Sequence, residues 1–494
     1  MSIPGPVRAS RRTATALAMA VCVLALGPRS AAAARILVPA EQPTIQAGID
    51  QAAPGDTVLV APGIYTGPGN RNLDFLGKNI RLVSAAGPQV TIIDGELADA
   101  RGIHLHSGEG GFFLEALIDG FTIRNFRPGP LTLPADGAGI RIAAGCSPLV
   151  QNCVFTGNVA ASGRGGGVST EGGTVQFCRI EGNGSGGSVP GLGGGLYVDN
   201  ATVAGCVIRE NWASDLGGIP GAGGGVALPD GAVTRCLIIG NRAGIGGGVY
   251  SECGLFSVYL TACTIAGNFA RVNAGGLAVA CDSQADVTSH LCIIWGNGIC
   301  GTPDISLDGD EVTAFLICTL LDPASVAGSG TPDYEPGCVF EDPQFCDPEE
   351  CAGDPPFSDG YDLAATSPAR GENNSCGQHM GSSHEVCAVA AAGEEAAPDL
   401  QSLGRPAPNP ATTEVRIALA GPLPDRTRVQ VYDAAGRLVR TLLDAGGEHG
   451  ANAGDGAITW DLQDAAGARV PNGVYFVRLR SAHHEENRPL VVAR

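Results

Sequence analysis

The chain has 494 residues, of which 74 are glycine, and its 50 acidic and 30 basic side chains give a net charge of −20. Such a surface opposes binding to nucleic acid or to anionic membranes. It also disfavours a polyanionic glycan unless Ca²⁺ bridges the two. Glycine costs about 1 kcal/mol per helical site, so this content argues against helical repeats.

The first 34 residues predict a secretory signal peptide. Three arginines (Arg8, Arg11 and Arg12) precede the apolar run 14–26, and alanines at 31–34 supply small residues before a cleavage site. The apolar run is too short to remain as a membrane span. We therefore expect a secreted or cell-surface protein whose mature chain has no membrane span. Cleavage removes Cys22 and leaves 16 of the 17 cysteines where disulfides can form.

Residues 37–65 predict an entry cap. Thr44 is a suitable N-cap, and Ile45, Ile49 and Ala52 share one face of a short helix. The helix should end near 54–55, and 57–60 should start the first strand. A short amphipathic helix can cover the open apolar end of a stacked repeat, which needs capping.

Six copies of a cysteine followed five positions later by an asparagine form a repeat with a mean period of about 28 residues. The pairs are Cys153–Asn158, Cys178–Asn183, Cys206–Asn211, Cys236–Asn241, Cys263–Asn268 and Cys292–Asn297. The residue two after each cysteine is large and apolar, whereas the residue between them varies. Each cysteine should therefore face inward on a short strand. Each asparagine should stand in the following turn, with its side-chain amide bonded to those of neighbouring coils. Asparagine also tolerates the left-handed turn conformation.

Glycine runs at 165–167, 193–195, 223–225, 246–248 and 275–276 each begin another short strand. About three short strands per ~28-residue period predict an all-β fold, a right-handed parallel β-helix over residues 35–387. The segment 120–125 (GFTIRN) matches the later cores with glycine in the cysteine position.

Other cysteines suggest disulfides or a longer inward column. Cys253 and Cys281 are one coil apart, and the pairs Cys346/Cys351 and Cys376/Cys387 are local candidates. Sequence alone cannot fix the pairing. Cys318 is a candidate seventh member of the inward column.

Residues 388–404 predict a linker, and 405–494 a small Ig-like β-sandwich. The linker is rich in alanine and glutamate and carries no pattern. Alternating apolar residues then return in short runs separated by turn signals such as Asn472–Gly473.

Two families resemble parts of this chain. The segment PTIQAGIDQAAPGDTVLVAPGIY (43–65), with the glycine runs and the cysteine–asparagine cores, resembles secreted β-helix proteins of the pectin-lyase-like superfamily. That superfamily mixes several activities, so the resemblance implies a fold rather than a reaction. The segments 408–410 (PNP), 431–442 and 459–479, with Arg494, resemble the FlgD-type Ig-like domain often found as a type IX secretion sorting domain. This second resemblance implies export, with the export machinery as a partner.

One column of acidic residues suggests a catalytic site. Counted from the glycine runs, the fourth strand position holds Glu171, Asp199, Pro229, Glu252 and Ala280. Glu171 and Asp199 would lie about 5 Å apart, close to the spacing of the carboxylates in retaining glycosidases. The alternatives are a Ca²⁺ or sugar contact and a plain solvated acidic edge.

Other candidate sites are less specific. Tyr197, Tyr250 and Trp295 are outward candidates for stacking on sugar rings. His104 and His106 share a strand face, but no third ligand stands at a telling spacing, so we predict no metal centre there. An acidic loop could hold Ca²⁺ through Asp304, Asp308, Asp310 and Glu311. The residue patterns of pectin methylesterases and polygalacturonases are not visible.

These observations leave two main hypotheses about function, besides a β-helix that serves only as a stalk. In the first, a secreted or surface β-helix presents a rigid face to an extracellular polysaccharide or surface partner. In the second, a polysaccharide-active hydrolase or lyase uses the acidic column on adjacent coils.

Overall fold

The computed structural model describes two separate parts of the chain. The first comprises residues 33–111, 116–129, 135–252, 258–280, 285–298, 302–345 and 361–382; the second comprises 402–403, 411–420, 427–433, 437–444, 457–465, 467–480 and 485–492. The chain divides into two compact units, residues 1–389 and 390–494. None of the helices in these described ranges is long and apolar enough to cross a membrane.

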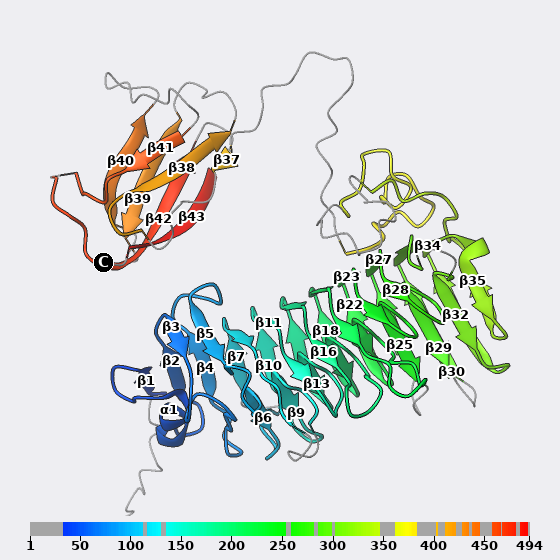
Figure 1. The fold of residues 1–494 in the computed structure, drawn as a ribbon. Coiled ribbons are helices and arrows are strands. Elements are labelled where there is room, and N and C mark those ends of the chain that lie inside the picture. Colours follow the sequence, from blue (N-terminus) through cyan, green and yellow to red (C-terminus); the bar gives the residue numbers. More distant parts are fainter. Residues whose placement is uncertain are drawn as a thin grey trace, which may run out of the picture. The chain divides into compact units, whose positions relative to one another are not determined.

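The first unit is a parallel β-helix, so the predicted fold class is confirmed (Figure 1). Each middle coil passes in turn through four sheets, here named C, A, B and D. Sheet A has twelve strands: β1 (Arg35–Val38), β2 (Thr57–Val60), β4 (Arg81–Ser84), β7 (Leu117–Asp119), β10 (Leu149–Gln151), β14 (Thr174–Gln176), β18 (Ala201–Ala204), β22 (Gly231–Thr234), β26 (Val258–Thr261), β30 (Ala285–His290), β33 (Val312–Ile317) and β36 (Thr331–Tyr334).

Sheets B, C and D complete the coils. Sheet B has ten strands: β3 (Gly63–Tyr65), β5 (Thr91–Asp94), β8 (Thr122–Arg124), β11 (Val154–Thr156), β15 (Arg179–Glu181), β19 (Val207–Arg209), β23 (Leu237–Ile239), β27 (Thr264–Ala266), β31 (Ile293–Trp295) and β34 (Leu320–Leu321). Sheet C has nine: β6 (Ile103–Leu105), β9 (Ile140–Ile142), β13 (Val168–Thr170), β17 (Leu196–Val198), β21 (Val226–Ala227), β25 (Val249–Glu252), β29 (Leu277–Ala280), β32 (Ile305–Asp308) and β35 (Val326–Gly328). The short sheet D has five: β12 (Val159–Ala160), β16 (Gly184–Ser185), β20 (Trp212–Ala213), β24 (Arg242–Ala243) and β28 (Phe269–Ala270).

A helix covers the N-terminal end, as predicted. It is α1 (Ile45–Gln51), and the Thr44 hydroxyl accepts a hydrogen bond of 3.2 Å from the Ala47 amide at its start. Ile45 and Ile49 are fully buried. The helix packs closely on the first coils, because a Cβ on Gly48 would come within 3.0 Å of both Val58 and Val38. A 3₁₀ turn (Pro323–Ser325) lies near the other end.

The six repeat cysteines line the interior as free thiols, each at most 1% exposed. Cys318 was predicted to be the seventh member of this column, and that prediction is wrong. Ile293 pairs with Leu320, so the residue aligned with Cys292 in the next coil is Thr319. Val339 pairs with Leu320 in turn, which places the free thiol Cys338 in the column one coil later.

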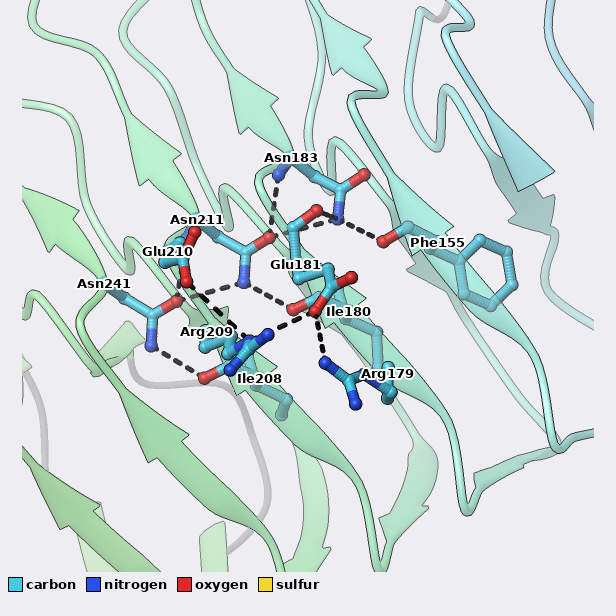
Figure 2. A network of polar contacts seen from close by, with 10 residues as sticks. All are labelled: Phe155, Arg179, Ile180, Glu181, Asn183, Ile208, Arg209, Glu210, Asn211 and Asn241. Atoms are coloured by element: carbon cyan, nitrogen blue, oxygen red, sulfur yellow. Dashed lines mark hydrogen bonds and ion pairs between the residues drawn. The ribbon is translucent and has the colours of Figure 1, made fainter. Parts of the chain in front are cut away.

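The repeat asparagines form a continuous buried ladder. Each side-chain amide donates to the side-chain oxygen of the next asparagine, at 2.8–3.1 Å, and to a main-chain carbonyl of the preceding coil. The side-chain oxygen of the next asparagine also accepts a hydrogen bond from the backbone N–H of the same donor asparagine. Figure 2 shows Asn183, Asn211 and Asn241 of this ladder. Satisfying every group in this way keeps polar side chains in the interior at little cost.

The left-handed residue of the turn is not the asparagine. It is the residue before it, with φ between 57° and 65° in all six copies, and it is Glu210 in one copy and glycine in the other five. Glycine adopts this conformation without a Cβ clash. The sequence-based register of 120–125 also shifts by one residue. Phe155 pairs with Ile123, so Phe121 occupies the cysteine position and Asn125 (φ 60°) the left-handed position.

The glycine runs lie where backbones of sheets C and D meet. A Cβ on Gly194 would come within 2.3 Å of the Trp212 carbonyl, and one on Gly224 would come as close to the Arg242 carbonyl. Any side chain there would push the two sheets apart. The repeated glycines therefore make a narrow corner in the cross-section of each coil.

Residues 361–382 form a strap across the outer face of the last coils of sheet B. Met380 and Leu363 pack on Ile293 and Leu320, and the Gly381 amide donates to the Leu291 carbonyl at 2.7 Å. A disulfide joins Cys376 to Cys318, so Cys376 is bridged, but not to Cys387. The other candidates, Cys253, Cys281, Cys346, Cys351 and Cys387, lie outside the described residues.

The second unit has two antiparallel sheets. One contains β37 (Ser402–Leu403), β38 (Val415–Ala420) and β41 (Ala457–Trp460), and the other β40 (Leu438–Asp444), β39 (Arg428–Asp433), β42 (Gly473–Arg480) and β43 (Glu485–Val492). Its core surrounds Trp460, which is fully buried. Two residues of the predicted linker, Ser402 and Leu403, belong to β37 and pair with β38.

Candidate functional site

The acidic column is aligned on sheet C as predicted from the glycine runs. Thr170 pairs with Val198, and the Asp199 amide donates to the Thr170 carbonyl at 2.9 Å, so Glu171 and Asp199 stand on neighbouring coils. Glu252 lies two coils beyond Asp199, with Pro229 between them.

Glu171 is committed to contacts within the protein. One of its oxygens lies 3.2 Å from Nη2 of Arg141, and the other accepts a hydrogen bond from the Ala144 amide at 3.2 Å. Arg141 also reaches Asp136, which is almost fully buried, at 2.5 Å. The same Asp136 carboxylate binds the side chain and the amide of Arg164. Charges therefore alternate along this face and largely neutralise one another.

Tyr197 lies beneath Arg164 rather than on the surface. The guanidinium sits 4.2 Å from the ring centroid and donates to the tyrosine hydroxyl at 2.8 Å, and Tyr197 is only 6% exposed. Tyr197 is thus unavailable for stacking on a sugar in this conformation. Tyr250 is half-buried, two coils further along the same column. Burial, followed by Glu252 and Asp308, raises the pKa of Tyr250 to about 12.

Asp199 differs from Glu171 in its surroundings. It has no hydrogen bond or ion pair from its side chain to the residues that the structure describes. Burial, then the nearby Asp230 and Glu171 carboxylates, raises the pKa of Asp199 above its usual value. Two carboxylates on adjacent coils therefore differ: one is paired with an arginine, and the other is partly buried near two further carboxylates.

The remaining metal candidates do not gather into a site. Asp304 is 4% exposed and accepts a hydrogen bond from the Asn297 amide, so it ends the asparagine ladder instead of joining the acidic loop. Burial, and then the positive charge of Arg101, lowers the pKa of His104 to about 4. His106 lies 3.4 Å from Asp74. Within the described ranges no three His, Cys, Asp or Glu residues could hold one ion.

The outer face of sheet B carries an ionic network above the ladder. Glu181 lies 3.0 Å from Arg179 and 3.1 Å from Arg209, and Arg209 lies 3.7 Å from Glu210 (Figure 2). These side chains are partly exposed. They come from adjacent coils and lie close to the turn that leads into sheet D.

Sheet D carries exposed residues that the sequence analysis missed. Its outward column pairs Gly184 with Trp212, Trp212 with Arg242 and Arg242 with Phe269. Trp212 is 37% exposed and Phe269 is 38% exposed. The signal in the sequence is position, because each of these residues directly follows a ladder asparagine.

Family comparisons agree with the two units. A model of the right handed beta helix region matches residues 84–303, and a model of the FlgD Ig-like domain matches residues 409–484. The right-handed β-helix is thereby confirmed. No curated protein matches the chain.

Two solved structures resemble small parts of the chain. PorZ of Porphyromonas gingivalis, described as an essential bacterial surface component of the type-IX secretion system, is 24% identical over 18% of this chain and 11% of its own, with a TM-score of 0.14. Dimeric latent PorU from the same organism is 25% identical over 20% of this chain and 10% of its own, with a TM-score of 0.15. This chain thus spans about a tenth of either protein, and likenesses of this extent do not bear on its activity.

Proposed function

We propose that this chain is an exported protein whose β-helix binds an extracellular polysaccharide on the outside of its coils without performing covalent chemistry. The observation that carries the proposal is the state of the acidic column. Both carboxylate oxygens of Glu171 contact other groups of the protein, Arg141 and the Ala144 amide. Large aromatic side chains, Trp212 and Phe269, are exposed elsewhere, on a short parallel sheet. Rigid side chains cost little entropy on binding, which favours a binding surface.

The proposal that the protein is exported rests on the sequences of its N-terminal segment and its C-terminal unit. The arginines and apolar run of the first 34 residues have the character of a signal peptide. The match of the FlgD Ig-like domain model to 409–484 supports an attachment or sorting role for the second unit, with the export machinery as its partner. The protein would then act in the medium or at the cell surface.

A panel of polysaccharides tests this function on the whole mature chain. Retention in native affinity gels reports binding, and reducing ends or unsaturated products in the same samples report cleavage. We expect retention without product release. Absence of retention by every polysaccharide would sink the proposal.

A hydrolase is a second candidate, favoured by the difference between Glu171 and Asp199. Burial raises the pKa of Asp199, and a carboxyl with a raised pKa can serve as a general acid. In this alternative Glu171, held by Arg141, acts as nucleophile or base and Asp199 as the acid. Product release that survives in Glu171→Gln/Asp199→Asn would exclude this pair as the catalytic site.

A further inference from the structure

The outside of sheet D presents an aromatic surface that follows the axis of the β-helix. Trp212 and Phe269 lie two coils apart in one column, roughly 10 Å by the spacing of strands. The six-membered ring of Trp212 lies on the backbone of Gly184, since a Cβ there would come within 2.1 Å of two ring atoms. The neighbouring coil thus holds the indole in place and leaves part of it open to solvent.

An apolar rim borders this column on the side of the loops that leave sheet D. Leu216 and Ile219 pair with each other in a tight hairpin, with both backbone hydrogen bonds at 3.0 Å, and Ile219 is 61% exposed. Asp215 anchors the hairpin, because it binds Arg271 two coils away and accepts from the Gly221 amide at 2.8 Å. The rim is therefore fixed to the coils that carry the two rings.

The opposite border is polar. Glu210 is the single non-glycine residue among the six repeat copies at the left-handed position, and it stands two residues before Trp212. Glu210 lies 3.7 Å from Arg209, so a carboxylate and a guanidinium stand two and three residues before Trp212 in the chain. Groups of both signs can exchange hydrogen bonds with hydroxyls.

Charge decides between the occupants that such a surface could take. A chain of net charge −20 disfavours the approach of a polyanion. A neutral sugar chain has apolar ring faces for the aromatic rings and hydroxyls for the polar border. An extended polysaccharide also advances by about one coil spacing per sugar, so it can meet successive coils in register.

We infer that the outer face of sheet D binds a neutral polysaccharide along the β-helix axis, with sugar rings on Trp212 and Phe269 and hydroxyls at Glu210 and Arg209. The inference rests on the proposed function and assigns the polysaccharide of that function to one face of the β-helix. Arg242, between the two rings, belongs to the same contact surface.

The test measures retention of the full mature chain by soluble neutral polysaccharides (hydroxyethyl cellulose, xyloglucan and galactomannan) and by polygalacturonate. Trp212→Ala removes the central ring and should weaken retention by at least about tenfold, as truncation of a central aromatic contact usually does. Gly184→Ala keeps the indole but displaces it, and should weaken retention as well.

Phe177→Ala is the matched control. Phe177 is 60% exposed and its ring lies on Gly205 much as Trp212 lies on Gly184, but it stands in the turn between sheets A and B. Its loss should leave retention unchanged. Circular dichroism of each variant verifies that the β-helix is intact.

Each outcome separates the site from the function. The inference is supported if the wild type and the Phe177→Ala variant are retained by a neutral polysaccharide and the Trp212→Ala and Gly184→Ala variants are not. Equal retention of the Trp212→Ala variant and the wild type overturns the site and leaves the proposed function standing. Retention by polygalacturonate alone overturns the neutral ligand, and no retention at all overturns both.

Discussion

The outer face of sheet B has two regions that differ although they belong to one repeat. Over β15 and β19 it carries the ionic network of Arg179, Glu181 and Arg209, which is partly exposed to solvent. Over β27, β31 and β34 the column that begins with Arg179 is uncharged and buried, with Ile293 at 1% and Leu320 at 0% exposure. The strap 361–382 makes the difference, because it covers only the later coils.

The comparison shows that an outward column has no fixed polarity. What covers a coil decides whether its outward side chains are charged or apolar. A repeat thus keeps its interior constant, with cysteine and asparagine columns, while its exterior changes from coil to coil.

The largest effect should come from placing a charge under the strap. Val207 and Ile293 occupy the same outward column, linked through Leu237 and Thr264. Ile293→Arg should lower the free energy of unfolding by about 3–5 kcal/mol, because an unpaired charge is buried or the strap is displaced. Val207→Arg should change it by less than about 0.5 kcal/mol. Urea unfolding followed by circular dichroism measures both, and equal effects would contradict the covering role of the strap.

Removal of the disulfide should loosen the strap without changing the coils. Cys318 and Cys376 are 58 residues apart in sequence, and a loop of that length gives about 4 kcal/mol of stabilisation in the chain-entropy account. Cys318→Ser/Cys376→Ser should therefore unfold at lower urea and bind a hydrophobic dye at the uncovered face. A reductant should shift the wild type toward the variant and leave the variant unchanged; any further shift of the variant would mean that another disulfide matters.

The asparagine ladder should contribute more to the free energy of unfolding than the ionic network above it. Asn211→Ala removes the interior hydrogen bonds that Asn211 accepts from the backbone and side-chain amides of Asn183 and the one that it donates to the Ile180 carbonyl, at a cost of about 2–3 kcal/mol. Glu181→Gln removes two ion pairs on a partly exposed face and should cost less than about 1 kcal/mol. The same unfolding experiment ranks them, and a reversed order would show that the exterior stabilises these coils.

The interior of the β-helix could be predicted from sequence because one rule repeats six times. The cysteine and asparagine columns follow from a fixed spacing and from the alternation of sides along a strand. The rule fails where a coil departs from it. In the coil of residues 120–126, Asn125 takes the left-handed position and Phe126 the ladder position. Aligning Asn125 with the ladder asparagines therefore shifts this coil by one residue.

The exterior could not be predicted, because its contacts join segments far apart in the sequence. Nothing near Cys376 indicates that it meets Cys318, since the strap folds back over earlier coils. Tyr197 was predicted to be exposed but lies under Arg164 from the preceding coil. Trp212 and Phe269 occupy two positions of a column that holds valine, glycine and arginine in other coils, so no periodic signal marks them.

The smallest effect concerns the end of the ladder, where Asp304 stands in place of the next asparagine. Burial raises the pKa of Asp304 to about 6, above its ordinary value. The native state therefore binds a proton more tightly than the unfolded chain. This contribution to stability is complete below pH ~4, declines as pH rises through about 6, and is absent above that. Asp304→Asn removes the cost of a buried carboxylate and should raise stability at pH 7.5 by about 1–2 kcal/mol.

The pH dependence of that gain identifies its cause. The difference between Asp304→Asn and the wild type should shrink toward zero at pH 4, where the carboxyl is protonated in both states. Asp310→Asn, on an exposed neighbour, is the control and should have no such dependence. A gain that is equal at pH 4 and pH 7.5 would assign the effect to amide hydrogen bonding rather than to charge, and would remove Asp304 as the titrating end of the ladder.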